Sequence, residues 1–170
     1  MKNRCEWAQN EPNLSYHDTE WGVPQHDDQK LFEFLILEGA QAGLSWTTIL
    51  NRRNGYRNAF CNFDVNAVSK FNQKDIKKLL NDDSIIRNKL KINSAINNAK
   101  QFIKIQKQFG TFDRYVWSFV NNEPIKNKFK KHSDLPAYTE ISENLSMDLK
   151  KRGFTFVGPT ICYAFMQAVG

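Results

Sequence analysis

Cysteine, long apolar runs and low-complexity segments are scarce or missing in this chain of 170 residues, and each lack excludes a class of protein. The three cysteines, Cys5, Cys61 and Cys162, are an odd number at wide spacings, which excludes a disulfide framework. They fit free thiols or a metal ligand in a reducing cytoplasm. No apolar run approaches the length of a membrane span, and the first residues lack the apolar region of a signal peptide. The sequence therefore predicts a cytoplasmic protein that makes no contact with membranes.

The composition is that of a folded domain with a basic charge balance. Hydrophobic residues make up 41% of the chain and aromatic residues 13%, which argues against disorder. A chain of this length forms one ordinary domain and can bury a real core. The net charge is +6 and the isoelectric point is near 9.2. This balance suits a polyanionic partner, and it also suits a protein that is merely soluble.

Apolar residues recur at helical spacing through most of the chain, and no pair of strands is evident. The sequence therefore predicts an all-α fold of many short helices in a single domain, residues 1–170. The predicted helices are 28–41, 45–60, 64–71, 74–80, 87–109, 112–120, 141–152 and one that begins at 160. Asp27, Ser45 and Asp64 are suitable capping residues, and the apolar stripe of the longest helix includes Leu90. Residues 1–26 are predicted to be irregular.

One carboxylate stands where two local effects oppose it. Glu38 comes at the end of an apolar run, in the last turns of the predicted helix 28–41. A buried carboxylate costs free energy unless it is hydrogen-bonded or paired, and the C-terminal end of a helix disfavours negative charge. Either Glu38 has a functional task, or it points outward and caps a neighbouring backbone amide. Its position in the sequence leaves both interpretations open.

The segment from about 145 to 168 combines a helix, a glycine-marked turn and a second helix. Pro159 suits the first position of the second helix, and Gly158 allows a ligand to approach the backbone closely. The free amides that follow, near Thr160, form an anion site. With three basic residues just before the turn, the pattern is typical of a helix-hairpin-helix, which binds DNA phosphates without reading sequence. The alternative is a plain corner between two helices.

Five motifs together resemble one known family over the whole chain. They are Cys5-x-Trp7, Tyr16-His17-Asp18-x-Glu20-Trp21-Gly22, Leu37-Glu38-x-x-Gln41-Ala42-Gly43-Leu44-Ser45-Trp46, Val116-Trp117-Ser118-Phe119-Val120-Asn121 and Lys151-Arg152-Gly153-Phe154-x-Phe156-Val157-Gly158. The family is 3-methyladenine DNA glycosylase I, a member of the helix-hairpin-helix glycosylase superfamily. The resemblance implies an all-α, two-lobed fold with the base pocket between the lobes.

The resemblance also implies an activity in base-excision DNA repair. Such an enzyme flips 3-methyladenine out of alkylated double-stranded DNA and hydrolyses its N-glycosidic bond, which leaves an abasic site. The methylated base is cationic in DNA and is already a good leaving group. The enzyme therefore needs to bind, desolvate and position the base more than it needs strong acid catalysis. A monomer suffices for this task, and no organic cofactor is expected.

The family's base-binding residues have matches in this chain. Glu38 matches the base-reading carboxylate, and we expect catalysis to depend on it. Tyr16 matches the partner of that carboxylate, and Trp46 matches the ring on which the base stacks. Trp7 and Trp21 are further candidates for base binding, although Trp21 is better explained as a core residue.

The family's DNA-contacting residues also have matches. Gln41, Gly43 and Leu44 would fill the gap that the flipped base leaves, with Leu44 as an apolar wedge. Gly158 and Thr160 would contact phosphate at the start of the last helix.

The family binds a structural zinc, and here the match is incomplete. Cys5 and His17 match the first pair of ligands, but the second pair belongs to a short tail past the last helix. This chain stops at Gly170, before that tail. Two ligands do not make a closed tetrahedral zinc site. We therefore expect either a truncated sequence or a member of the family that lacks the metal.

Three other interpretations remain open at the level of sequence. The chain could be a DNA-binding module without enzymatic activity, built on the helix-hairpin-helix. It could be a structural metal-binding helical protein, although the ligand set argues against this. It could also be a glycosylase for another alkylated base, such as 3-methylguanine or 7-methylguanine.

Overall fold

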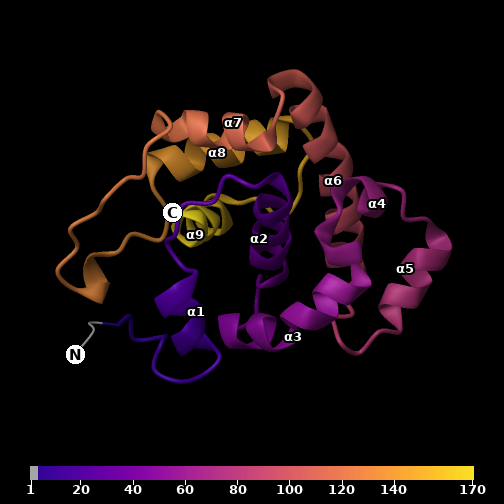
Figure 1. Cartoon of the computed structure of the whole chain (residues 1–170), viewed down its shortest axis with the longest axis horizontal. Coiled ribbons are helices and arrows are strands. Elements are labelled where there is room, and N and C mark those ends of the chain that lie inside the picture. The colour runs from indigo at the N-terminus through magenta and orange to yellow at the C-terminus, as the bar shows by residue number, and fades with distance from the viewer. Residues whose placement is uncertain (1–3) are drawn as a thin grey trace.

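The computed structural model describes residues 4–170. Within that range it contains helices and turns and no strand, so the prediction of an all-α fold is confirmed (Figure 1). The helices, with η for a short 3-10 helix, are α1 (Asn13–Thr19), α2 (Asp28–Ala40), α3 (Trp46–Ala59), η1 (Cys61–Phe63), α4 (Val65–Ser69), α5 (Gln73–Leu80), α6 (Lys89–Phe109), α7 (Phe112–Trp117), η2 (Ser118–Val120), η3 (His132–Asp134), α8 (Glu140–Lys151) and α9 (Pro159–Val169). In the described chain no helix is both long enough and apolar enough to cross a membrane.

Most helices begin where a capping side chain predicts it. The Asp27 carboxylate accepts a hydrogen bond from the Lys30 amide at 3.0 Å, which begins α2. Ser45 does the same for the Thr48 amide at the start of α3, at 3.2 Å. Each cap satisfies an amide that the first turn of a helix leaves without a partner. Local sequence therefore determines where these helices begin.

Two predictions about local structure are wrong. Residues 1–26 contain the helix α1, which follows Pro12 directly. The Glu11 carboxylate accepts hydrogen bonds from the Ser15 amide at 3.2 Å and from the Ser15 hydroxyl at 2.7 Å. A helix of seven residues is too short to show an apolar repeat, so the pattern missed it. Leu90 is 71% exposed, so the apolar stripe of α6 does not include it.

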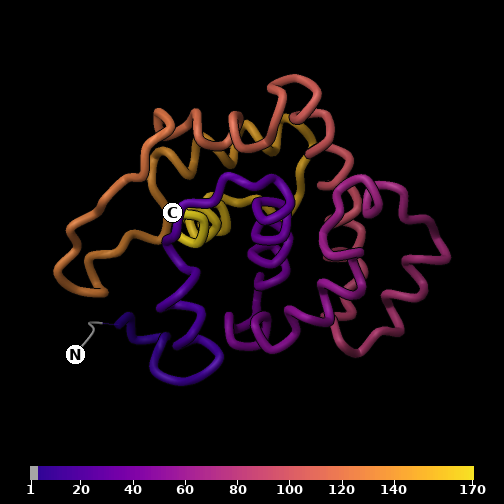
Figure 2. Tube along the Cα trace, viewed as in Figure 1, coloured from indigo at the N-terminus to yellow at the C-terminus, as the bar shows by residue number. Residues whose placement is uncertain are grey.

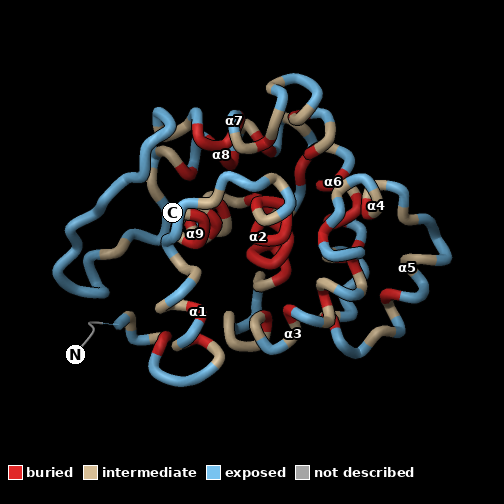
Figure 3. Tube along the Cα trace, viewed as in Figure 1, coloured by how far each residue is buried: buried red, intermediate tan, exposed pale blue. Residues whose placement is uncertain are grey.

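Helix α2 lies at the centre of the molecule and is buried along most of its length (Figures 1 and 3). It packs against α3, α6, α7 and α9. In Figures 1 and 2, α4, α5 and α6 lie on one side of α2, α3 crosses below its end, and α7 and α8 lie above its start. Aromatic rings fill the contact with α6 and α7, where Phe102 lies 5.2 Å from Phe32 and 4.1 Å from Phe112 between ring centroids. A side chain on α2 is therefore held by a helix that is buried among its neighbours.

Candidate functional site

Glu38 points into the protein, in the last turn of α2. Its side chain is buried, with 5% exposure, and its carboxyl makes no hydrogen bond to any residue in 4–170. Burial raises the pKa of Glu38 to about 8, because the ionised form loses its hydration and gains no partner. An outward-facing Glu38 that caps a backbone amide is therefore the wrong interpretation. A buried carboxyl that is mostly neutral at pH 7 is ready to accept a donor or a positive charge.

Tyr16 and Trp46 bring two more unpartnered polar groups to the same place. Tyr16 comes from α1 and Trp46 from the first position of α3, and their ring centroids are 5.5 Å apart. The Tyr16 hydroxyl and the Trp46 Nε1 are both buried and have no hydrogen-bond partner among the described residues. Burial raises the pKa of Tyr16, and the neighbouring charge of Glu38 raises it further. The three side chains predicted to read the base therefore converge from three helices.

A site with these groups is incomplete without a ligand. A buried polar group without a partner costs about 1–3 kcal/mol, so folded proteins rarely keep several together. Here the polar groups lie between aromatic rings, and Phe34 adds another ring 6.4 Å from Tyr16. A flat aromatic ligand with hydrogen-bonding edges would satisfy the polar groups and stack on the rings. A positive charge on that ligand would favour the ionised form of Glu38.

The structure separates the two remaining tryptophan candidates. Trp7 lies 6.2 Å from Tyr16 and 5.4 Å from Trp21 between ring centroids, so it connects the base-binding rings to Trp21. Trp21 stacks on His17 instead, and it also lines a separate apolar groove of about 570 Å³ beside α9. Glu38, Tyr16 and Trp46 do not line that groove. Trp7 therefore adjoins the Tyr16 ring, and Trp21 lies one ring further away.

An ion network centred on the buried side chains of Glu33 and Arg53 was missed at the sequence level. Arg53 of α3 donates to Glu33 of α2 at 2.8 Å and to both carboxylate oxygens of Glu20 at 2.8 and 2.9 Å. Burial alone would raise the pKa of Glu33, but hydrogen bonds from Arg53 and Arg57 outweigh it and lower that pKa. The Arg53 guanidinium also lies 5.3 Å from the centre of the Phe34 ring. The network ties the end of α1, α2 and α3 together around Tyr16.

The predicted DNA-contacting turn 41–44 projects from the end of α2. The Leu44 amide donates to the Gln41 carbonyl at 2.7 Å, which closes the turn, and Gly43 has a φ of +77° that favours glycine. Leu44 is 37% exposed, although it is apolar. Leu44 is therefore a partly exposed apolar side chain at the end of a tight turn.

The connection between α8 and α9 is held by side chains from two helices. The Ser146 hydroxyl donates to the Val157 carbonyl at 2.6 Å, and Asn98 of α6 exchanges hydrogen bonds with the Thr155 backbone at 2.9 and 3.0 Å. Gly158 immediately precedes α9, and Thr160 is exposed in its first turn. The turn is therefore rigid, and it presents the start of α9 to solvent.

Cys5 and His17 do come together, but the described residues include no group of three potential ligands that contains them. The Cys5 amide donates to His17 Nε2 at 3.4 Å, and His17 Nδ1 lies 3.0 Å from the Asp18 carboxylate. Both ring nitrogens of His17 therefore face protein groups. Burial also raises the pKa of the Cys5 thiol, which disfavours the thiolate that a metal binds. Across residues 4–170, no group of three or more potential ligands is close enough to hold an ion, so the structure gives zinc no support.

The fold and the site define a class of protein. It is an all-helical protein whose central helix carries a buried carboxyl close to a cluster of aromatic rings, two of which hold buried polar groups without a partner among the described residues. A family model described as methyladenine glycosylase matches residues 7–170. The chain belongs to that family.

Similar proteins carry the same description. The DNA-3-methyladenine glycosylase 1 of Escherichia coli K12 is 46% identical over 168 residues, which is 98% of this chain and 90% of that protein. The DNA-3-methyladenine glycosylase of Haemophilus influenzae is 44% identical over 171 residues, which is 100% of this chain and 92% of that protein. A solved structure of a tyrosine-to-phenylalanine variant of 3-methyladenine DNA glycosylase I, in complex with 3-methyladenine, superposes with a TM-score of 0.95. It is 35% identical and covers 99% of this chain and 91% of its own.

Proposed function

We propose that this chain is a DNA-3-methyladenine glycosylase that acts in base-excision repair of alkylated DNA. Its membership of the methyladenine glycosylase family supports this function at the level of the whole chain. The observation that carries the proposal is the cluster in which the buried Glu38 carboxyl lies close to Tyr16 and Trp46, whose buried polar atoms have no partner among the described residues. A methylated adenine would supply both a polar edge and a flat face to this cluster.

The base would bind by stacking and by charge. Its ring lies against Trp46, and its amino edge donates to the Glu38 carboxyl, with the Tyr16 hydroxyl as a second partner. The methylated base carries a positive charge in DNA, and an adjacent positive charge favours the carboxylate form of Glu38. Glu38 would therefore lose its proton as the lesion enters. An unmethylated adenine is neutral and would gain less from the same carboxyl, which gives selectivity for the lesion.

The chemical step needs little from the protein beyond this binding. The glycosidic bond between the sugar C1′ and the base nitrogen breaks, and its electron pair goes to the base, which leaves as a neutral molecule. Water adds its oxygen to C1′ and releases a proton, which produces the abasic site. Holding the flipped base in the protein prevents its return to the base stack and so raises the fraction of lesions that are in the reactive, flipped conformation.

DNA binding would use the exposed turns around the pocket. We propose that Gln41, Gly43 and Leu44 fill the gap in the duplex. Gly158 and Thr160 would contact phosphate through a helix-hairpin-helix at about 145–168. The net charge of +6 favours a polyanionic partner. We further propose that the chain is a single glycosylase domain with its base pocket between two lobes. It would act as a monomer in the cytoplasm.

Release of bases from methylated DNA tests the proposal directly. The purified chain is incubated with duplex DNA methylated at random, and the freed bases are separated by chromatography. We expect 3-methyladenine, and we expect much less from the Glu38→Gln variant under the same conditions. Release of 3-methylguanine or 7-methylguanine instead would assign a different lesion. Salt-sensitive duplex binding without release of any base would favour a DNA-binding module and refute the enzyme.

A further inference from the structure

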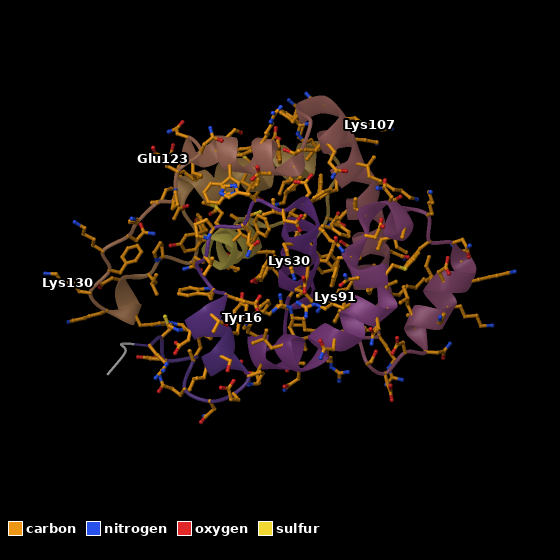
Figure 4. All side chains as sticks on the ribbon, in the orientation of Figure 1. Tyr16, Lys30, Lys91, Lys107, Glu123 and Lys130 are labelled. Atoms are coloured by element: carbon orange, nitrogen blue, oxygen red, sulfur yellow. The ribbon has the colours of Figure 1, made fainter. Side chains whose placement is uncertain are left out.

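A lysine from a distant helix holds the turn that carries Leu44. Lys91, near the start of α6, donates hydrogen bonds from its Nζ to the Ala40 carbonyl at 2.8 Å and to the Ala42 carbonyl at 2.6 Å. The end of an α-helix leaves its last carbonyls without intrahelical partners. Figure 4 labels Lys91, whose hydrogen bonds join α6 to the end of α2. The lysine therefore ends α2 and shapes the turn at the same point.

The contact is specific to Lys91 among its neighbours. Lys89 is exposed, and so is Leu90, whereas Lys91 is partly buried. Burial lowers the pKa of Lys91, which still leaves an ammonium group that donates to both carbonyls. Two charge-assisted hydrogen bonds on alternate carbonyls restrict the backbone on both sides of Gln41. Leu44 follows within the same closed turn, so its direction depends on this restraint.

The same helix also holds the turn that leads into α9. The Asn97 side chain of α6 donates to the Gly153 carbonyl at 2.8 Å, and the Asn98 side chain donates to the Thr155 carbonyl at 2.9 Å. Gly39 of α2 faces Phe156 of this turn, where an added Cβ would lie 3.4 Å from the Phe156 Cβ. Helix α6 therefore fixes the position of the turn 41–44 relative to the connection between α8 and α9. If both segments contact one DNA duplex, the distance between them must be fixed in this way.

We propose that Lys91 is a positioning residue for opening the duplex: it holds the turn 41–44 so that Leu44 can enter the base stack. This inference rests on the proposed function. Lys91 binds backbone carbonyls rather than the base, so its effect is on duplex DNA and not on the pocket. Binding of the free base tests the pocket alone, and excision from a duplex tests the pocket and the wedge together.

The test compares these two measurements in the Lys91→Met variant. We expect kcat/KM for excision of 3-methyladenine from duplex DNA to fall about tenfold or more, as loss of a charge-assisted hydrogen bond predicts. We expect the dissociation constant of free 3-methyladenine, followed by tryptophan fluorescence, to stay within about twofold. Lys91→Arg keeps a cation that donates to both carbonyls and should recover most of the duplex activity. Lys89→Met removes the same charge from an exposed position and is the matched control, which should excise like the wild type.

A double variant separates positioning from other roles. Leu44→Ala should reproduce the duplex defect, and adding Lys91→Met to it should cause little further loss, because both act through one wedge. Additive losses would overturn the inference, and so would parallel loss of free-base binding and excision in Lys91→Met. If Lys91→Met does not fold, Lys91→Gln, which removes the charge and keeps an amide donor, serves the same comparison. Wild-type duplex activity in folded Lys91→Met, or in Lys91→Gln where it replaces that variant, refutes this role alone, whereas a wild-type protein that releases no base refutes the proposed function as well.

Discussion

Replacing Glu38 by glutamine should make the protein more stable at neutral and alkaline pH while removing most of its activity. Glu38 is almost fully buried, and its pKa is raised from an ordinary value of 4.5 to about 8. Between these two values the folded protein holds a proton that the unfolded chain releases. The stability that this group contributes is therefore fully present below pH 4.5 and is lost as the pH rises toward 8.

The size of the effect follows from the two pKa values. The full difference corresponds to about 5 kcal/mol, and the part that falls between pH 5 and pH 8 is about 3 kcal/mol. Glutamine does not titrate, so Glu38→Gln lacks this trend. Its buried amide costs some free energy, but that cost is the same at each pH. For a chain of this size, about 3 kcal/mol corresponds to roughly 10 °C in melting temperature.

The assay is the pH dependence of stability for wild type and variant, measured by chemical denaturation from pH 5 to pH 8. All other titrating groups are shared, so the difference between the two curves reports Glu38. Glu123→Gln is a matched control, because Glu123 is exposed and should follow the wild type. We expect the wild type to lose about 3 kcal/mol relative to Glu38→Gln across this range. Parallel curves would refute the assignment of a buried, unpartnered carboxyl.

The same variant tests the role of the charge in catalysis. Glutamine can accept a hydrogen bond but cannot carry a negative charge toward a cationic base. Excision should therefore fall by about 10- to 100-fold, the range that loss of a charged partner gives. A Glu38→Gln protein with full activity would show that the pocket recognises the base without this carboxylate.

Three further substitutions have defined outcomes. Tyr16→Phe removes an unpartnered buried hydroxyl, so thermal melting should show equal or higher stability and titration should show weaker base binding. Trp46→Ala should weaken binding of free 3-methyladenine by about 1–3 kcal/mol in a fluorescence titration, and unchanged affinity would exclude stacking there. Arg53→Met removes one of the three cations that contact the buried Glu33, along with the partner of Glu20, and should cost about 1–3 kcal/mol in denaturation, whereas Arg57→Met, at a side chain that is 31% exposed, should cost less.

Several features of this protein could be predicted from its sequence because they depend on neighbouring residues. Helix starts at Asp27, Ser45 and Asp64 follow from side chains that cap the amide three positions later. Apolar spacing predicted the helices that bury a face. The motifs around Tyr16, Glu38 and Trp46 indicated a family whose membership the comparisons show.

Other features were decided by the tertiary structure, because they depend on residues that are distant in the chain. The sequence left open whether Glu38 points inward, since that depends on how α2 packs among its neighbours. Arg53 donates to Glu20, which is 33 residues away in the sequence. Lys91 donates to the carbonyls of Ala40 and Ala42, which are 51 and 49 residues away. Local pattern carries no information on such pairings. Burial, unpartnered polar atoms and shifted pKa values all arise from packing, and so the chemistry of the pocket became visible only in the folded chain.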